Sequence, residues 1–386
     1  MLSDRVRNIA PSATLAVDAK AKQLKKEGKD VLNFGAGEPD FNTPDNIKEA
    51  AKRAIDKNIT RYTPVGGIPE LREAIAKKFR EVNKIRYDAS EVVVCSGGKH
   101  VLYNIAMAML NKDDEAILPV PYWVSFEEII KLAGAKTVFC NTDEKFKLTA
   151  KDVEEKITDK TKMLILNSPS NPSGAIVDKS EIEKIAKLAV ENNFYVVADE
   201  VYEYFVYGNK ERASIASLNN EIKNLTVTAN SFSKTYAMTG WRVGYCGANK
   251  EIIGGIENLQ GHSTSNTSNI AQMAALEALN GSQDSVREMI RAFDERRKFM
   301  HKRLNEMNRI SCVEPEGAFY AFPDISRTKM SSMEFASKLL EEALVAVVPG
   351  SAFGSDKHVR LSYAASMEDI EKGMDRMEKW VRGKVQ

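Results

Sequence analysis

The sequence predicts an α/β protein with a large domain on a mostly parallel, seven-stranded sheet covered by helices, and a smaller α+β domain formed by the two chain ends. A length of 386 residues exceeds what one hydrophobic core usually fills. Short apolar runs alternate with helical segments until about residue 275, and long charged helices follow. We therefore expect residues 45–275 to form the large domain, and residues 1–44 with 276–386 to form the small one.

Seven apolar runs predict the strands of the sheet. They are rich in Val, Ile and Leu and recur with helical segments between them, which is typical of parallel strands buried on both faces. The runs are 91–95, 116–118, 137–140, 162–167, 195–199, 225–229 and 242–246.

Helix boundaries are marked by proline, glycine and capping residues. Thr43-Pro44 predicts a helix with Thr43 as its cap and Pro44 as its first residue, and Ile68-Pro69 predicts another. A helix over about 14–27, ended by Gly28, could pack on either domain, and we assign it to the small one. In the C-terminal region we expect helices over about 285–308, 333–342 and 367–382.

Charge and composition narrow the class of partner. Because 55 Lys and Arg balance 54 Asp and Glu, the expected partners are small molecules or a second copy of the chain, rather than nucleic acid or a membrane. The first twenty residues lack the apolar stretch of a signal peptide, so we expect a cytoplasmic protein. The four cysteines indicate reduced core thiols, and the four scattered histidines do not predict a metal site.

The stretch SFSKTYAMTGWRVGYCGA follows a strand and carries the most informative residues. Ser231, Ser233 and Arg242 could bind a phosphate beside the amine of Lys234. A lysine after a strand is, taken alone, more often a solvated charge. The interpretation therefore depends on the residues upstream.

Two upstream motifs add a carboxylate and two hydrogen-bond donors. Asp199 ends a strand, at the edge where open α/β sheets bind ligands, and Tyr202 and Asn171 accompany it. Alone, Asp199 would be read as a helix cap and Asn171 as a turn residue. Together they suit a pyridoxal cofactor, which needs a carboxylate at its ring nitrogen and donors at its phenolate oxygen.

The turn CSGGKH could supply phosphate-binding amides. Gly97, Gly98 and Lys99 join a strand to a helix, whose N-terminus favours an anion, although a plain turn uses glycines equally well. The phosphate loop of nucleotide enzymes is excluded because its first glycine and its Ser or Thr are missing. GAGEPD lacks the third glycine of the dinucleotide fingerprint.

The motifs NPSG, ADEVYE and SFSKTYAMTGWRVGY resemble those of class I aminotransferases of the fold-type I pyridoxal-phosphate enzymes, closest to the bacterial aspartate aminotransferase subgroup. The resemblance runs from PSATLAV to VRLSYA, nearly the whole chain. It implies pyridoxal 5′-phosphate as cofactor, bound to Lys234 as an internal aldimine. It also implies that Lys234 moves the proton between the substrate α-carbon and the cofactor, with a pKa lowered by burial and by cationic neighbours.

The resemblance also assigns roles to residues outside these motifs. Trp123 would stack on the cofactor ring, and with Asn171 it would contact the substrate, whereas on its own it is more often core. Arg360 would grip the substrate α-carboxylate, with the backbone of Gly37 close by. Tyr62 would reach the phosphate of a neighbouring subunit, which implies a homodimer with shared sites.

Recognition of the second carboxylate separates the candidate substrates. The segment 261–269 lacks the arginine that many aspartate aminotransferases supply from the partner, but the resembling subgroup uses a lysine and hydroxyls that correspond to Lys99, Ser12 and Thr14. We expect transfer of the amino group of L-aspartate to 2-oxoglutarate by a ping-pong mechanism, with prephenate as a further acceptor.

Two alternatives stay open on sequence grounds. An aromatic or alanine aminotransferase would use the same scaffold. A cofactor-sensing regulator is disfavoured, because the motifs begin by residue 12 and leave no room for a DNA-binding module, and because the net charge is near neutral.

Overall fold

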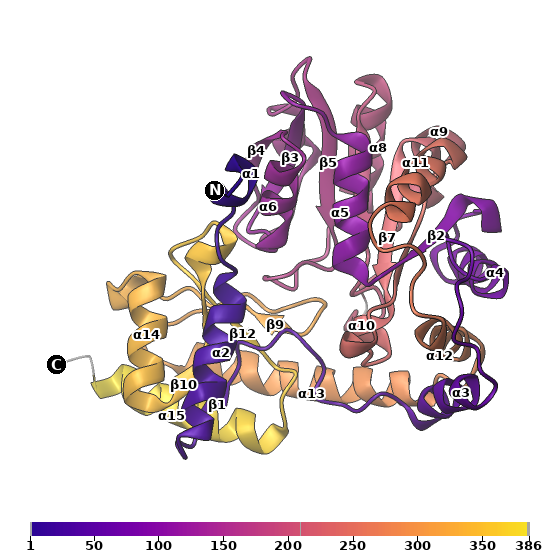
Figure 1. Cartoon of the computed structure of the whole chain (residues 1–386). Helices are drawn as coiled ribbons and strands as arrows, with labels where there is room; N and C mark the ends of the chain where they lie inside the picture. Colours follow the sequence, from indigo (N-terminus) through magenta and orange to yellow (C-terminus); the bar gives the residue numbers. More distant parts are fainter. Residues whose placement is uncertain (1, 209, 384–386) are drawn as a thin grey trace.

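The computed structural model describes residues 2–208 and 210–383. Figure 1 shows the central sheet with its helices in the upper part of the molecule. In the lower part, the indigo helix α2 and strand β1 lie beside the orange and yellow α14, β10 and α15, whereas α1 lies near β4 and α6. No helix of the described residues has the length and apolar character needed to cross a membrane.

The central sheet of the described chain contains seven strands in the order β2-β8-β7-β6-β5-β3-β4. All neighbouring pairs are parallel except those of β8, which runs antiparallel to β2 and to β7. Each of the seven predicted runs forms one of these strands, which confirms the predicted α/β class. The strands are β2 Val92–Cys95, β3 Glu115–Val120, β4 Lys136–Asn141, β5 Thr161–Asn167, β6 Tyr195–Asp199, β7 Thr226–Ser231 and β8 Gly244–Gly247.

Both faces of the sheet are covered by helices, which explains why the strands are continuous apolar runs. Along β6, Val197 packs in the cluster that holds α5, α6 and α11, whereas Val196 and Ala198 pack in the cluster that holds α8. The helices that follow or cover these strands are α3 Asp45–Asp56, α4 Pro69–Lys78, α5 Gly98–Met109, α6 Ser125–Leu132, α7 Ala150–Glu154, α8 Lys179–Glu191, α9 Asn220–Asn224, α10 Phe232–Thr235, α11 Lys250–Gly261 and α12 Asn269–Asn280.

The residues from the chain ends form two small sheets and their helices. Leu32 pairs with Val345 in a parallel bridge of β1 and β10, and β9, β11 and β12 form an antiparallel sheet. These elements are α1 Asp4–Arg7, α2 Ala13–Lys26, β1 Leu32–Asn33, α13 Asp284–Glu306, β9 Tyr320–Ala321, α14 Ser332–Ala343, β10 Val345–Ala346, β11 Val348–Pro349, β12 Val359–Ser362 and α15 Met367–Gly383. Short 3₁₀ or π turns are η1 Phe79–Asn83, η2 Ala89–Glu91, η3 Ile215–Ser217, η4 Thr239–Trp241, η5 Ser326–Thr328 and η6 Gly350–Phe353.

Helix α2 packs with the C-terminal elements. Ala21 and Leu24 of this helix share a hydrophobic cluster with Leu340 and Ala346. Gly28 follows the helix at φ +83°, a left-handed conformation that favours glycine.

We propose two domains, formed by the sheet region and by the chain ends. Residue 275 falls inside α12, and Ala278 near the end of that helix packs in the same cluster as Ile47 and Leu71 of the sheet region. For this reason we place the second boundary after α12 rather than at 275.

The predicted cap at Thr43 is wrong. Helix α3 begins at Asp45 after Pro44, and no side chain caps it. The Thr43 hydroxyl instead donates to the carbonyl of Ala237 at 2.6 Å and accepts from the indole of Trp241 at 3.0 Å. A long-range contact thus takes the hydroxyl that the local pattern assigns to the helix. The other marker holds, since Pro69 is the first residue of α4.

Candidate active site

A cavity of about 460 Å³ opens at the carboxyl ends of β5, β6 and β7, the edge where open α/β sheets bind ligands. Residues from the chain ends close it from the other side. Fourteen of the predicted site residues line it: Ser12, Thr14, Gly37, Gly98, Lys99, Trp123, Asn171, Asp199, Tyr202, Ser231, Ser233, Lys234, Arg242 and Arg360. The other two predicted site residues do not line the cavity. Gly97 packs against the guanidinium of Arg242, and Tyr62 is exposed on the surface.

Lys234 projects into this cavity from the short helix α10, which follows β7. Its Nζ donates a hydrogen bond to the carbonyl of Gly37. Burial, followed by the positive charge of Arg360, lowers the pKa of Lys234 to about 8. A larger share of this amine is therefore uncharged near neutral pH than in an ordinary lysine, and an uncharged amine is a nucleophile and a base.

Asp199 ends β6 and is 7% exposed. The backbone N–H of Val201 donates to its Oδ1 at 3.2 Å. Burial raises the pKa of Asp199 to about 6, although this N–H and the charge of Lys234 act in the opposite direction. A buried carboxylate in a cavity suits a ligand that brings a protonated nitrogen.

Arg360 lies on β12 and is 2% exposed. Its guanidinium donates to Asn171 Oδ1 at 3.0 Å and to the carbonyl of Gly35 at 2.8 Å. Its Nε is buried with no hydrogen-bond partner, and no carboxylate of the described residues pairs with it. Because buried cations are normally paired, this site suits an anionic ligand.

The Arg360 guanidinium makes cation–π contacts with two aromatic rings. The ring centre of Tyr320 is 4.4 Å away and that of Phe353 is 5.0 Å away. A Cβ added at Gly37 would lie 3.1 Å from the Tyr320 hydroxyl and 3.9 Å from Arg360 Nη2. The absence of a side chain at Gly37 therefore keeps this end of the cavity open.

One end of the cavity has the features of a phosphate site. Gly97 precedes α5 at φ +94°, and a Cβ there would lie 2.2 Å from Arg242 Nη2. The first backbone amides of the twelve-residue helix α5 lie at its N-terminus, which carries a positive partial charge. Ser231 and Ser233 stand beside it, with their hydroxyl oxygens 2.7 Å apart. This donor set, the amine of Lys234 and the carboxylate of Asp199 fit the parts of a pyridoxal phosphate.

The residues predicted for the distal carboxylate also line the cavity. The Nζ of Lys99 lies 5.0 Å from the ring centre of Trp123, and burial with the nearby Arg242 lowers the pKa of Lys99. The hydroxyls of Ser12 and Thr14, at the start of α2, are 3.0 Å apart.

Several lining residues were not predicted from the sequence, and Tyr320 is the most informative. Its hydroxyl lies 2.9 Å from that of Tyr202. In AFYAF an aromatic residue is more simply read as core, so only its contacts with Tyr202 and Arg360 reveal it. Glu38 carried no signal either, and it accepts a hydrogen bond from Thr239 at 2.8 Å. Other unpredicted lining residues are Leu15, Asp18, Lys22, Gly35, Ala36, Leu102, Val124, Ser125, Asn167, Val201, Ala229 and Asn230.

The fold and the donors in this cavity define an enzyme of the pyridoxal-phosphate-dependent fold-type I class. Residues 29–377 match the family of class I and II aminotransferases, and the chain belongs to this family. Family membership confirms the resemblance seen in the sequence and implies pyridoxal phosphate as the cofactor.

Two relatives that match the chain over nearly its full length carry aspartate aminotransferase names. The chain is 46% identical to an aspartate aminotransferase of Bacillus sp. strain YM-2 over 99% of both chains. It is 48% identical to a probable aspartate/prephenate aminotransferase of Aquifex aeolicus over 98% of both.

Solved structures agree with these relatives. The aspartate aminotransferase of Thermus thermophilus with maleate superimposes with a TM-score of 0.95 at 42% identity, over 98% of this chain and 99% of that one. An aromatic aminotransferase of Pyrococcus horikoshii gives 0.90 at 42% identity, over 94% and 99%.

Proposed function

We propose that the protein is an aspartate aminotransferase, which moves the α-amino group of L-aspartate to 2-oxoglutarate, and back, in two half-reactions. The observation that carries this proposal is the pair of cationic groups in one cavity with a reactive lysine. Arg360 suits one carboxylate, and Lys99 with Ser12 and Thr14 suits a second. The names of the relatives support an acidic substrate.

The chain's own residues would hold the cofactor at each of its functional groups. When bound, pyridoxal phosphate withdraws the electrons left at the substrate α-carbon. Lys234 would hold its aldehyde carbon, Asp199 would accept from the ring nitrogen, and Trp123 would cover one ring face. Donors to the phenolate oxygen would be Asn171 and Tyr202. The phosphate would be bound by the backbone amides of Gly97, Gly98 and Lys99, by the side chains of Ser231, Ser233 and Arg242, and by Tyr62 of a second subunit.

Lys234 would also move the proton. The lowered pKa of Lys234 would allow its free Nζ to accept the proton of the substrate α-carbon. Arg360 would orient the substrate by a bidentate contact to the α-carboxylate, next to the backbone of Gly37 and near Trp123 and Asn171.

A homodimer with shared sites follows from the proposed role of Tyr62. This side chain is 91% exposed and lies outside its own cavity. A role at a phosphate would therefore require a second subunit. Light scattering should give about twice the chain mass of 43.0 kDa, and a monomeric mass with full activity would contradict the shared site.

We also propose a cytoplasmic location. The four cysteines are buried and unpaired, which suits a reducing compartment. Fractionation of the source cells tests this proposal, and activity outside the cytoplasmic fraction would contradict it.

The decisive experiment is the absorbance spectrum of the purified protein before and after L-aspartate is added without an oxo acid. A band of lysine-bound cofactor that converts to the aminated form supports cofactor, half-reaction and donor together. A band that does not change when aspartate is added would favour an aromatic or alanine aminotransferase. The similar Pyrococcus horikoshii structure is an aromatic aminotransferase. No band after addition of cofactor would contradict the proposal.

Prephenate as an acceptor is a narrower proposal, supported by the name of the Aquifex aeolicus relative. The assay uses L-aspartate as donor and prephenate as the only acceptor. If no amination of prephenate is detected while 2-oxoglutarate is aminated, this part of the proposal is wrong.

A further inference from the structure

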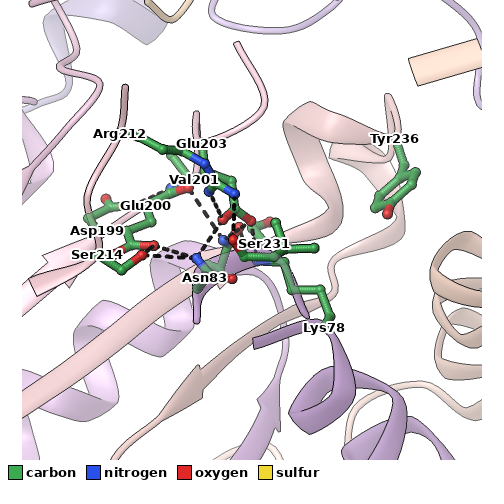
Figure 2. A network of polar contacts seen from close by, with 12 residues as sticks. Lys78, Asn83, Asp199, Glu200, Val201, Glu203, Arg212, Ser214, Ser231 and Tyr236 are labelled. Atoms are coloured by element: carbon green, nitrogen blue, oxygen red, sulfur yellow. Dashed lines mark hydrogen bonds and ion pairs between the residues drawn. The ribbon is translucent and has the colours of Figure 1, made fainter. Parts of the chain in front are cut away.

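A cluster of mostly buried polar side chains lies next to the segment that carries Asp199 (Figure 2). We call it the Glu203 cluster. Its charged members include Glu203, Glu200 and Lys78, which are 3%, 7% and 6% exposed. The full set is Lys78, Asn83, Glu200, Glu203, Arg212, Ser214 and Asn230.

Glu203 is the centre of this cluster, because four donors from three segments converge on its two carboxylate oxygens. Oε1 accepts from Lys78 at the end of α4 and, at 2.7 Å, from Asn230 on β7. Oε2 accepts from Arg212 and, at 2.7 Å, from Asn83 in η1. Burial by itself raises the pKa of the Glu203 carboxyl. The positive charges and hydrogen bonds of Lys78 and Arg212 have a larger combined effect, so the pKa is lowered overall.

Asn230 connects Glu203 to both ends of the proposed cofactor site. Its Nδ2 donates hydrogen bonds to Glu203 Oε1 and, at 3.3 Å, to the carbonyl of Glu200. Glu200 directly follows Asp199 in the chain. The Oδ1 of Asn230 accepts at 2.7 Å from the backbone N–H of Ser231, which stands at the phosphate end. A single amide thus joins the turn after β6 to the last residues of β7.

Stability alone does not account for so many buried charges. A buried ion pair commonly adds little compared with apolar side chains of the same volume, whereas the loss of one partner is costly. A network whose polar groups are satisfied does restrict the geometry of the segments it joins. The segments joined here are those that present Asp199 and Ser231.

We propose that Glu203 is a positioning residue for cofactor binding, which holds Asp199 and Ser231 at a fixed separation through Asn230. The inference rests on the proposed roles of Asp199 at the ring nitrogen and Ser231 at the phosphate. Glu203 itself lies outside the residues that line the cavity and acts only through its neighbours.

Glu203→Gln is the sharpest test, because it keeps the side-chain shape and removes the charge. We expect the dissociation constant for pyridoxal phosphate, from spectroscopic titration of the cofactor-free protein, to rise about tenfold or more, and kcat to fall about tenfold to a hundredfold. The pKa of the lysine-bound cofactor band should shift, while KM for aspartate changes less than kcat. Glu203→Asp, which keeps the charge, should restore part of the affinity.

Glu316→Gln is the matched control. Like Glu203, Glu316 pairs with two cations, Lys147 at 3.2 Å and Lys210 at 2.7 Å, and lies outside the cavity lining. Among the described residues, the side-chain partners of Glu316 are these two lysines rather than Asn230. This control variant should leave the cofactor affinity at the wild-type value. If Glu203→Gln lowers thermal stability but keeps wild-type affinity and band pKa, Glu203 is merely structural and the proposal is overturned.

A milder variant keeps the test valid if Glu203→Gln does not fold. Arg212→Gln removes one of the two cations from a partly exposed position, so we expect a smaller loss of cofactor affinity in the same direction. Wild-type affinity in this variant would overturn the proposal. A wild-type protein without any cofactor band would instead contradict the proposed function, so the two failures are distinguishable.

Discussion

The hydroxyl of Tyr202 lies 2.9 Å from the hydroxyl of Tyr320. Tyr202 is the proposed donor to the cofactor's phenolate oxygen, and the ring of Tyr320 supports the guanidinium of Arg360 at 4.4 Å. One buried aromatic residue therefore contacts both the proposed cofactor-binding tyrosine and the proposed substrate-binding arginine.

We expect the hydroxyl and the ring of Tyr320 to affect different kinetic constants. Tyr320→Phe removes the hydrogen bond to Tyr202 and keeps the ring, so kcat should fall about two- to tenfold, the range expected for one hydrogen bond. KM for aspartate should stay close to the wild-type value. Tyr320→Leu also removes the ring beside Arg360 and should raise KM. Steady-state kinetics of both variants checks this, and equal KM increases would show that the division is wrong.

Lys99→Ala tests the site for the second carboxylate. Loss of one charged hydrogen bond, worth about 1.5–3 kcal/mol, should lower kcat/KM for aspartate about tenfold to a hundredfold. Activity with alanine or an aromatic donor should change little. Lys22→Ala is the control, because Lys22 also lines the cavity but pairs with Asp18 at 2.7 Å. Equal losses for all donors would assign Lys99 to the phosphate alone.

Cofactor capture should depend on the ionisation of Lys234. Burial and Arg360 lower its pKa to about 8, and only the neutral amine attacks an aldehyde. The rate at which cofactor-free protein captures pyridoxal phosphate should therefore rise as pH increases through about 8 and level off above it. A midpoint near the ordinary lysine value would contradict the lowered pKa. Lys234→Ala should show no covalent capture at any pH.

Asp199→Asn should increase stability and abolish most activity. Burial raises the pKa of Asp199 to about 6 from its ordinary 3.8, so the carboxyl stabilises the fold fully below the unfolded-state value, and this contribution is lost as pH rises through about 6. The variant should therefore unfold at a higher temperature than the wild type in cofactor-free form at about pH 8. The gain should be at most about 3 kcal/mol at about pH 8 and should shrink to well under about 1 kcal/mol near pH 4. Calorimetry at both pH values checks this, and equal midpoints at about pH 8 would contradict it.

Local patterns in the sequence were sufficient for the strands and for much of the candidate site. Strands buried on both faces must be apolar throughout, and residues at the carboxyl ends of parallel strands gather at one edge of the sheet. For these reasons the sequence alone predicts that Asp199 and Ser231 lie near Lys234. The roles of Arg360 and Gly37 came from the family resemblance, because nothing local links them.

The remaining features depend on contacts between distant parts of the chain. The order of the strands, with antiparallel β8 between β2 and β7, is not encoded in any single strand. Arg360 donates a hydrogen bond to the carbonyl of Gly35, 325 residues away. The Thr43 hydroxyl donates to the carbonyl of Ala237 instead of capping the helix that follows it. The Glu203 cluster joins four segments whose charged residues look like ordinary surface residues. Such contacts arise only when the core brings the segments together, because burial, not sequence spacing, decides which polar groups must find partners.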